Sequence, residues 1–293
     1  MRVAVTGGLG FLGRALCRVL RDLGHRPVAL DHPATPGDGE SLPVDVGDAA
    51  AVSDAIARLR PDAVVHLAAL LTPASRADIV AATRVNALGT ANVFAAARAA
   101  GVRRIVYASS VAALGLADGA RDDAAPQPRS VYGATKAFGE HLAAALAADD
   151  PGLTLVGLRL GWVYGPGRER GWRIVQEVIE QAARGEKVVR YPDFRDALDW
   201  TWIDDAAAIV ARAVSAPLAG HHVLNVAGDK RTMAEAVAHL RRRYPRTLFE
   251  PYAAETPPSS WGFANDGLQA ALGAVPRTRM EDGIDRLIDA LRR

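Results

Sequence analysis

The stretch "TGGLGFLG", residues 6–13, follows a short apolar run and leads directly into a helical pattern. Gly7, Gly10 and Gly13 have the spacing G-x-x-G-x-x-G, and Gly8, Gly10 and Gly13 also satisfy G-x-G-x-x-G. Glycines so placed permit a tight turn, a close approach of the backbone to a phosphate, and packing of the helix against the strand. The helix N-terminus then presents free N–H groups and a partial positive charge to an anion. A strand, this turn and a helix in that order predict a dinucleotide-binding unit.

Short apolar runs and helical patterns alternate through the first half of the chain. Continuous apolar runs are typical of strands in a parallel sheet that is covered on both faces. We expect strands at 2–7, 26–31, 62–69, 103–110 and 153–161, and helices at 11–23, 48–59, 78–100 and 131–148. The alternation predicts an α/β fold with a Rossmann-type, doubly wound parallel sheet and right-handed crossovers.

After about residue 165 the alternation weakens, although amphipathic helices are still expected at 171–185, 231–245 and 278–293. We predict two units. Residues 1–165 would form an NAD-binding domain, and residues 166–293 a smaller substrate-binding lobe that could be interleaved with the last strands of the sheet.

The composition excludes several partners. A net charge of +2 gives no reason to expect nucleic acid or an anionic membrane. The single cysteine, Cys17, rules out an internal disulfide, and no cluster of His, Asp and Glu has the spacing of a metal site. The apolar run at the start is too short for a signal peptide, and no stretch approaches the roughly 20 apolar residues of a membrane span. We therefore expect a cytoplasmic protein without a metal.

Asp31 ends the second expected strand. A carboxylate there can accept hydrogen bonds from the ribose hydroxyls of a dinucleotide and would repel a 2′-phosphate, which favours NAD over NADP. Arg26 and His32 lie nearby in the sequence and could also approach the ribose.

"SVYGATK", residues 130–136, places Tyr132 and Lys136 one helical turn apart. Residues i and i+4 share a helix face, and an ammonium beside a phenol lowers its pKa from about 10. Ser110, at the end of the strand in "YASS", could hold a substrate oxygen at the same place, because ligands bind at strand C-termini in open α/β sheets. The pattern suggests proton transfer, although Y-x-x-x-K also occurs by chance on solvated helices.

Taken together, these segments resemble the extended branch of the short-chain dehydrogenase/reductase superfamily, also called the NAD-dependent epimerase/dehydratase family. The matching segments are 6–13, Asp31, "DV" (45–46), "HLAA" (66–69), "VNALGT" (85–90), "YASS" (107–110), "YGATK" (132–136), "LRLGWVYGPG" (158–167) and "WIDDAA" (202–207). They span most of the first 210 residues.

The resemblance implies a role for each matching residue. Tyr132 would be the general acid/base, Lys136 would lower its pKa and hold the nicotinamide ribose, Ser110 would orient the substrate oxygen, and Asn86 would support the proton path or its helix. The implied NAD contacts are Gly7, Gly10, Phe11, Leu12, Gly13, Asp31, Asp45, Val46, Leu67, Ala68, Ala69, Tyr132 and Lys136, with Asp45 and Val46 at the adenine.

The chain departs from nucleotide-sugar relatives at two positions. Trp162 stands where they carry an asparagine that touches the substrate, and Leu198 stands where they carry an arginine that pairs with its diphosphate. Leucine cannot pair with a phosphate, so a smaller substrate is expected, with Trp162 and Trp200 filling part of the pocket. Arg168 and Arg195 are candidates to clamp an anionic substrate group, although a solvated surface is an equally ordinary place for arginine.

The leading interpretation is an NAD-dependent oxidoreductase that acts on a secondary alcohol or carbonyl of a small sugar, sugar acid or polyol. An epimerase, which oxidises and then returns the hydride, uses the same residues and stays open as an alternative. A non-catalytic NAD-binding regulator is a remote third. The resemblance also implies a role in carbohydrate metabolism and a homodimer paired through the helix at 131–148 and the helix before it.

Overall fold

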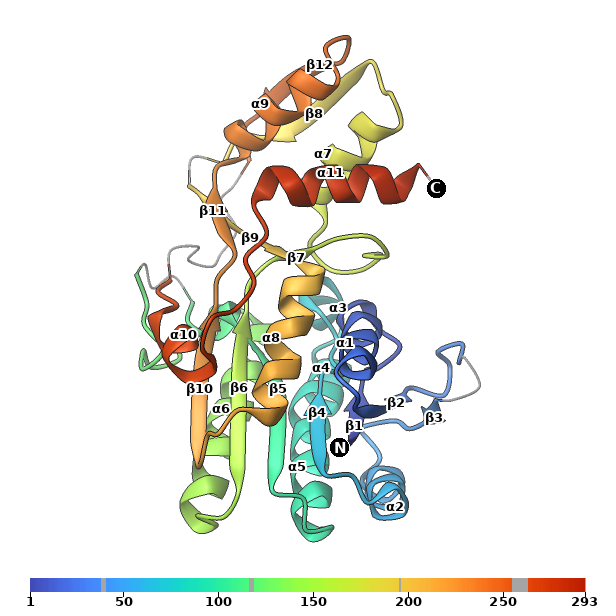
Figure 1. Ribbon diagram of the computed structural model, residues 1–293, viewed down its shortest axis with the longest axis vertical. Coiled ribbons are helices and arrows are strands. Elements are labelled where there is room, and N and C mark those ends of the chain that lie inside the picture. Colours follow the sequence, from blue (N-terminus) through green and yellow to red (C-terminus); the bar gives the residue numbers. More distant parts are fainter. Residues whose placement is uncertain (38–40, 116–118, 195, 255–262, 293) are drawn as a thin grey trace.

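The computed structural model describes residues 1–37, 41–115, 119–194, 196–254 and 263–292. Its central feature is a seven-stranded, fully parallel sheet in the order β10-β6-β5-β4-β1-β2-β3 (Figure 1). The strands are β1 (Arg2–Thr6), β2 (Arg26–Asp31), β3 (Leu42–Pro43), β4 (Ala63–His66), β5 (Arg104–Ser110), β6 (Thr154–Leu160) and β10 (His221–Val226). The strand order reverses beside β1, and the predicted doubly wound α/β fold is confirmed.

Helices cover both faces of this sheet. Helix α1 (Phe11–Asp22) and helix α8 (Ile203–Ser215) pack together over one face, and α2 (Ala49–Leu59), α5 (Gly89–Ala99) and α6 (Val131–Asp149) cover the other. Apolar side chains of β1, β4, β5 and β6 are divided between the two faces, so both faces of these strands are buried. This two-sided burial explains why the strands read as continuous apolar runs.

The predicted helix at 78–100 is interrupted. It consists of α4 (Ile79–Ala82), a π-helix η1 (Thr83–Leu88) and α5. A short helix α3 (Thr72–Ala77) precedes it, and a 3₁₀ turn η2 (Val111–Ala113) follows β5. Single π turns inside α-helices are frequent at functional sites.

The later part of the chain builds a second layer above the sheet (Figure 1). Its strands are β7 (Val163–Tyr164), β8 (Val188–Pro192), β9 (Leu198–Trp202), β11 (Asp229–Arg231) and β12 (Leu248–Tyr252), which form the small sheets β11-β9-β7 and β12-β8. Its helices are α7 (Ile174–Ala183), α9 (Met233–Arg243) and α11 (Met280–Leu291), whereas α10 (Asp266–Leu272) packs against β10 and α8 at the first sheet. Strand β10 and helix α8 follow residue 165 in the sequence but pack with the first sheet. The division of the chain into a domain of residues 1–165 and a lobe of residues 166–293 therefore stays a prediction.

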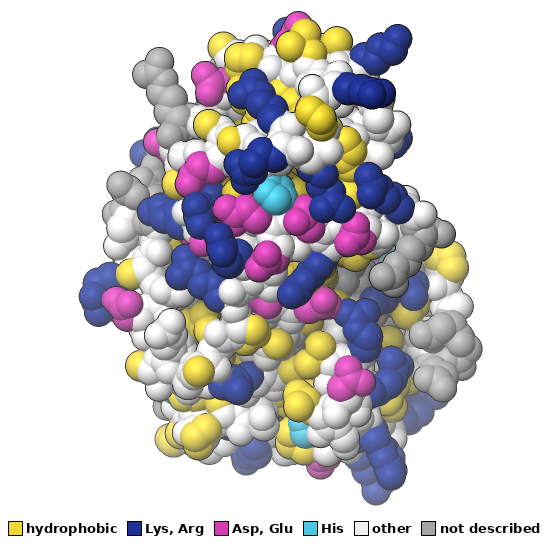
Figure 2. Space-filling view, turned by 45° about the horizontal axis from the view of Figure 1, so that its top comes forward, with side chains coloured by type: hydrophobic (Ala, Val, Ile, Leu, Met, Phe, Trp, Pro, Cys, Tyr) yellow, Lys and Arg dark blue, Asp and Glu magenta, His cyan; other side chains and the backbone are white. Residues whose placement is uncertain are grey.

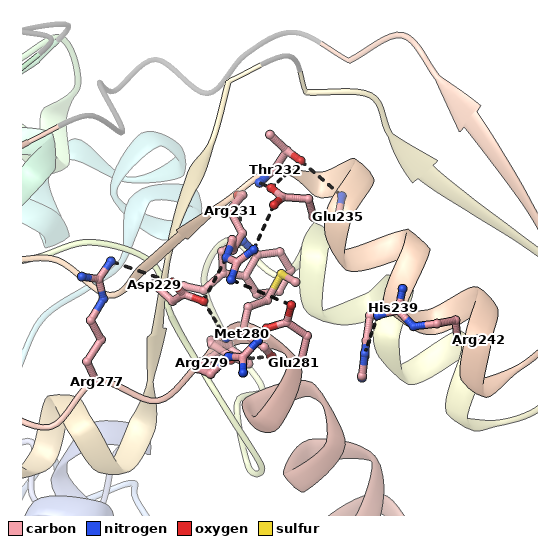
Figure 3. Close-up of polar contacts among 12 residues, drawn as sticks. Asp229, Arg231, Thr232, Glu235, His239, Arg242, Arg277, Arg279, Met280 and Glu281 are labelled. Atoms are coloured by element: carbon pink, nitrogen blue, oxygen red, sulfur yellow. Dashed lines mark hydrogen bonds and ion pairs between the residues drawn. The ribbon is translucent and has the colours of Figure 1, made fainter.

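Asp229 fixes the start of α11 (Figure 3). Its carboxylate accepts a hydrogen bond of 2.9 Å from the backbone N–H of Met280 and lies 3.3 Å from Arg231. A carboxylate at a helix N-terminus is stabilised by free N–H groups and by the helix dipole. On the face shown in Figure 2, acidic and basic side chains are interspersed, in keeping with the small net charge. Within the described residues, no helix is long and apolar enough to cross a membrane.

Candidate active site

The glycine turn between β1 and α1 leaves no room for side chains. A Cβ on Gly13 would lie 2.1 Å from the carbonyl oxygen of Gly7, and a Cβ on Gly7 would lie 2.7 Å from the backbone nitrogen of Ala68. Gly7 also has a φ of +67°, which favours glycine. The turn is thus pressed against both α1 and the segment after β4. This bare backbone at a helix N-terminus fits a pyrophosphate.

The Asp31 carboxylate lies beside that turn at the C-terminal end of β2. It accepts hydrogen bonds from the backbone N–H of Leu9 at 2.9 Å, from the N–H of His32 at 2.9 Å and from the hydroxyl of Thr35 at 3.0 Å. These donors fix the carboxylate where a ribose would meet it. Arg26 begins β2 and therefore lies at the opposite end of the strand, away from this position.

Asp45 and Val46 follow β3 at the same edge of the sheet. Asp45 accepts the N–H of Gly47 at 2.9 Å and pairs with Arg84 at 2.9 Å. Burial raises the pKa of Asp45, but the bonds from Gly47 and Arg84 outweigh it, so the pKa of this carboxyl is lowered. Val46 is buried against Gly89 of α5. Their contacts with adenine stay predictions, as do the roles of Phe11 and Leu12 at the start of α1 and of Leu67, Ala68 and Ala69 after β4.

Tyr132 lies in the first turn of α6, where Ser130 caps the helix by accepting the N–H of Gly133 at 3.0 Å. The Ser110 side chain, at the end of β5, accepts the N–H of Ala112 at 3.2 Å and lies close enough to the Tyr132 hydroxyl for a hydrogen bond that lowers the pKa of the tyrosine. Burial raises the pKa of Tyr132 to about 12, whereas the bond with Ser110 and the charge of Arg168 lower it. The fold therefore brings the two predicted residues together.

Lys136 lies one turn further along α6, and its Nζ is 5.5 Å from the centre of the Tyr132 ring. The ammonium donates a 2.7 Å hydrogen bond to the carbonyl oxygen of Ala108. Burial lowers the pKa of Lys136 to about 8. The lysine is thus close to the tyrosine, and its roles toward the phenol and the ribose stay predictions.

Asn86 lies in the π-helix η1 and joins two parts of the site. Its Oδ1 accepts the N–H of Leu70 at 2.7 Å, and its Nδ2 donates to the Leu70 carbonyl at 3.0 Å and to the Thr135 hydroxyl at 3.2 Å. The amide therefore links the segment after β4 to α6. Of the two expected roles of Asn86, these contacts favour support of the helix over support of a proton path.

Arg168 extends from the loop after β7 toward the glycine turn. Its guanidinium lies 5.7 Å from the centre of the Phe11 ring and donates to the carbonyls of Val163 and Trp172. Its Nε is buried without a partner among the residues that the structure describes. Burial, together with the charge of Arg173, lowers the pKa of Arg168 to about 10. Arg195 lies outside the described residues, so the structure says nothing of its predicted role.

Trp162 is the centre of an aromatic cluster. It stacks on Tyr164 with the ring centres 5.1 Å apart and makes edge contacts with Trp172 at 5.9 Å and Trp200 at 5.0 Å. Trp162 is only 3% exposed and Leu198 is fully buried. The two positions where the sequence departs from nucleotide-sugar relatives are thus filled by packed apolar side chains.

His66 contributes a contact that the sequence reasoning did not identify. It is buried, with Nδ1 2.7 Å from the Thr6 hydroxyl and Nε2 3.0 Å from the Thr90 hydroxyl. Thr90 in turn donates to the backbone carbonyl of Asn86. The histidine ties the ends of β1 and β4 to the helix that carries Asn86. In the sequence, His66 is marked only by its position in the "HLAA" segment. That position does not indicate that its two partners are threonines distant in the sequence.

A parallel sheet with a glycine-lined turn at one strand end, and a serine and tyrosine pair beside it, defines an NAD-dependent enzyme with a Rossmann fold. The model of the NAD-dependent epimerase/dehydratase family matches residues 3–227, and the chain belongs to this family. NAD is accordingly its cofactor, and the chain is a dehydrogenase or epimerase of the extended short-chain type.

Known proteins with different substrates resemble the chain. It is 35% identical to a 2-alkyl-3-oxoalkanoate reductase of Stenotrophomonas maltophilia over 82% of this chain and 74% of that one. It is 35% identical to an L-arabinose 1-dehydrogenase (NAD(P)(+)) of Haloferax volcanii over 65% of this chain and 74% of that one. The solved structure of MoeE5 in complex with UDP-glucuronic acid and NAD is 31% identical, covers 100% of this chain and 99% of its own, and has a TM-score of 0.86.

Proposed function

We propose that the chain oxidises a secondary alcohol, or reduces the matching carbonyl, of a small sugar, sugar acid or polyol that carries no nucleotide. The observation that carries this proposal is the aromatic cluster around Trp162 together with the buried Leu198. These side chains occupy the positions at which nucleotide-sugar relatives hold the substrate and its diphosphate. Leu198 offers a diphosphate no hydrogen-bond donor, and Trp162 offers only a buried indole N–H. Burying an unpaired charge there is costly.

The proton chemistry is assigned to Tyr132. When bound, NAD accepts or supplies the hydride. In oxidation, the Tyr132 oxygen takes the proton of the substrate hydroxyl, and in reduction it returns the proton to the carbonyl oxygen. Ser110, which is bonded to Tyr132, holds the same substrate oxygen. Lys136 adds a positive charge close to the phenol ring, and this charge favours the phenolate.

Arg168 favours a substrate with an anionic group. It lies close enough to Tyr132 for its charge to lower the tyrosine's pKa, and its buried Nε lacks a partner among the described residues. Guanidinium binds carboxylates through two parallel hydrogen bonds. The likeness to a 2-alkyl-3-oxoalkanoate reductase, which by its name acts on a carboxylate, supports this preference.

The alternative is a nucleotide-sugar epimerase, which is supported by the likeness to MoeE5 in complex with UDP-glucuronic acid. The two functions differ in the fate of the hydride. A dehydrogenase forms one NADH for each product molecule, whereas an epimerase forms product without net NADH.

The test is a screen for NAD⁺ reduction over aldoses, uronates, aldonates and polyols, with UDP-glucose and UDP-glucuronate assayed in parallel. Turnover is expected with a free sugar or sugar acid, and Tyr132→Phe should lower kcat by about 10²- to 10⁴-fold. Tyr191→Phe is a matched control, because Tyr191 is buried in β8, outside the site. Turnover confined to the nucleotide sugars would refute the proposed substrate class, and full activity of the Tyr132→Phe variant would refute the acid/base assignment.

The proposed function also includes an oligomeric state and a cellular location. We propose a homodimer paired through α5 and α6, supported by an apolar groove between these helices lined by Ala91, Ala95, Arg98, Ala99, Leu142 and Leu146. A cytoplasmic location, as expected from the sequence, is proposed with it; a lone cysteine is compatible with a reducing compartment.

A further inference from the structure

A buried ion pair connects β6 to α6, the helix that carries Tyr132 and Lys136. Arg159 of β6 and Glu140 of α6 have side chains only 3% and 4% exposed. The guanidinium binds the carboxylate through two parallel bonds, Nε to Oε1 at 2.9 Å and Nη2 to Oε2 at 2.8 Å. Replacing such a pair by apolar residues is often neutral or stabilising, so stability alone does not account for it.

Glu140 connects the pair to both catalytic elements. It lies one helical turn after Lys136 on α6. It also accepts a 2.5 Å hydrogen bond from the hydroxyl of Ser109, the neighbour of Ser110 at the end of β5. The carboxylate therefore holds the end of β5 against the helix that carries Tyr132.

Arg159 connects the pair to the loop that precedes α6. Its Nη1 donates to the carbonyl of Asp122 at 3.1 Å, and its Nη2 donates to the carbonyl of Ala124 at 3.1 Å. Asn225 at the end of β10 holds the same loop, because its N–H donates to the Asp122 carboxylate at 2.6 Å and its side chain to the Ala120 carbonyl at 3.0 Å. The loop then runs directly into the N-cap of α6.

The loop also lies beside the 3₁₀ turn η2, which follows Ser110, because the N–H of Gln127 donates to the Ala113 carbonyl at 2.8 Å. We propose that Arg159 and Glu140 are a positioning pair that fixes loop 119–128 against α6 as a rigid wall beside the Ser110 end of β5. Only a guanidinium can do this, because its planar fork donates to one carboxylate and two carbonyls at once. A lysine could keep the ion pair but could not also hold both carbonyls. The wall would set the affinity for substrate and leave NAD binding unchanged. This consequence for substrate rests on the proposed function.

Arg159→Lys tests the proposal, with Arg104→Lys as the matched control. Arg104 also donates to two backbone carbonyls, those of Ala216 and Leu218, but it starts β5 at the opposite end of the sheet. Hydrogen exchange is measured on the NAD-loaded protein at the amides of Ala124 and Gln127, which are bonded to Arg121 and Ala113. Arg159→Lys should accelerate exchange there by about tenfold, whereas Arg104→Lys should leave it unchanged.

The kinetic arm uses D-galacturonate as the probe. Arg159→Lys should raise its KM several-fold while the KM for NAD⁺ stays the same, and Arg104→Lys should alter neither. Unchanged loop exchange, or faster exchange without a rise in KM, would overturn the proposal. If the wild-type protein does not turn over D-galacturonate, the proposed preference for a sugar acid fails, and the exchange result still decides whether the pair holds the loop.

A second variant covers the case in which Arg159→Lys does not fold. Asp122→Ala removes the carboxylate that binds the Asn225 N–H but leaves the buried pair intact. Arg159 still holds the backbone carbonyls of residues 122 and 124 in this variant, so exchange at the Ala124 and Gln127 amides should stay slow. Fast exchange would show that the contact with Asn225 holds the loop and would overturn the proposal. Fast loop exchange already in the wild-type protein would show that no rigid wall exists.

Discussion

The hydrogen bond between Ser110 and Tyr132 opposes the effect of burial on the tyrosine. Burial raises the pKa of Tyr132 to about 12, and the bond with Ser110 lowers it. Ser110→Ala should therefore raise the pKa further. Because the phenolate is the base in oxidation, the rising limb of kcat/KM against pH should move to higher pH in this variant. Ser110→Thr keeps the hydroxyl and should keep the limb in place; an unshifted limb in Ser110→Ala would show that the bond does not tune the base.

His66 should make the protein sensitive to acid. Burial, together with the charge of Lys136, lowers the pKa of His66 to about 3. A histidine in the unfolded chain titrates near 6.5, so the unfolded state takes up a proton that the folded state refuses as pH falls from about 6.5 to about 3. The free energy of unfolding should fall through this window, by at most about 1.4 kcal/mol per pH unit.

Urea unfolding at a series of pH values measures this slope. His66→Gln is the comparison, because an amide can bond to Thr6 and Thr90 without titrating. The variant should show a flatter dependence between neutral and acid pH. If the wild-type protein and the variant lose stability in parallel, His66 is not the titrating group.

In the turn before α1, the space for a side chain differs between Gly10 and Gly13, two glycines of the same motif. A Cβ on Gly13 would lie 2.1 Å from the Gly7 oxygen, whereas a Cβ on Gly10 would lie 3.1 Å from it. Gly10 also has φ and ψ of −72° and 176°, which any residue adopts. Gly13→Ala should therefore destabilise the turn by about 1–3 kcal/mol. We expect Gly10→Ala to have a smaller effect.

Thermal unfolding and titration of NAD measure the difference between these variants. Gly13→Ala should lower Tm more than Gly10→Ala does, whereas both variants should weaken NAD binding, because both glycines are predicted NAD contacts. Equal losses in Tm would mean that close packing of α1 on the turn is not what Gly13 provides.

At the scale of the whole molecule, the groove between α5 and α6 predicts self-association. Leu142 and Leu146 line it together with alanines of α5, and Phe138 of α6 is 42% exposed nearby in sequence. Leu142→Glu should place a charge in the interface and yield a monomer in sedimentation experiments. Leu248→Glu is the control, because Leu248 is also exposed but lies on β12 in the other layer. A wild-type monomer, or a dimer that survives Leu142→Glu, would exclude this interface.

The sequence predicted those features that depend on local pattern. Buried parallel strands are continuous apolar runs, and the glycine turn is constrained by its own backbone, so the sheet and this turn could be predicted from the sequence. Features formed by residues distant in the sequence could not. The π-helix η1 contains no proline or glycine pair to announce it, and Arg159 meets Glu140 only because β6 packs beside α6. Neither residue was singled out from the sequence, because no local pattern marks Glu140 or its partner.

The π-helix also limits which changes in length the chain can accept. Its wider turn holds one more residue than an α-helical turn would, and Asn86 reaches Leu70 and Thr135 from within it. Deleting one residue from 83–88 would let the segment wind as a regular α-helix, in which each residue advances the helix by about 100°. Such a deletion would turn Asn86 away from one partner or rotate α5 out of its packing. We therefore expect insertions and deletions to be tolerated in the surface loops and excluded from this turn.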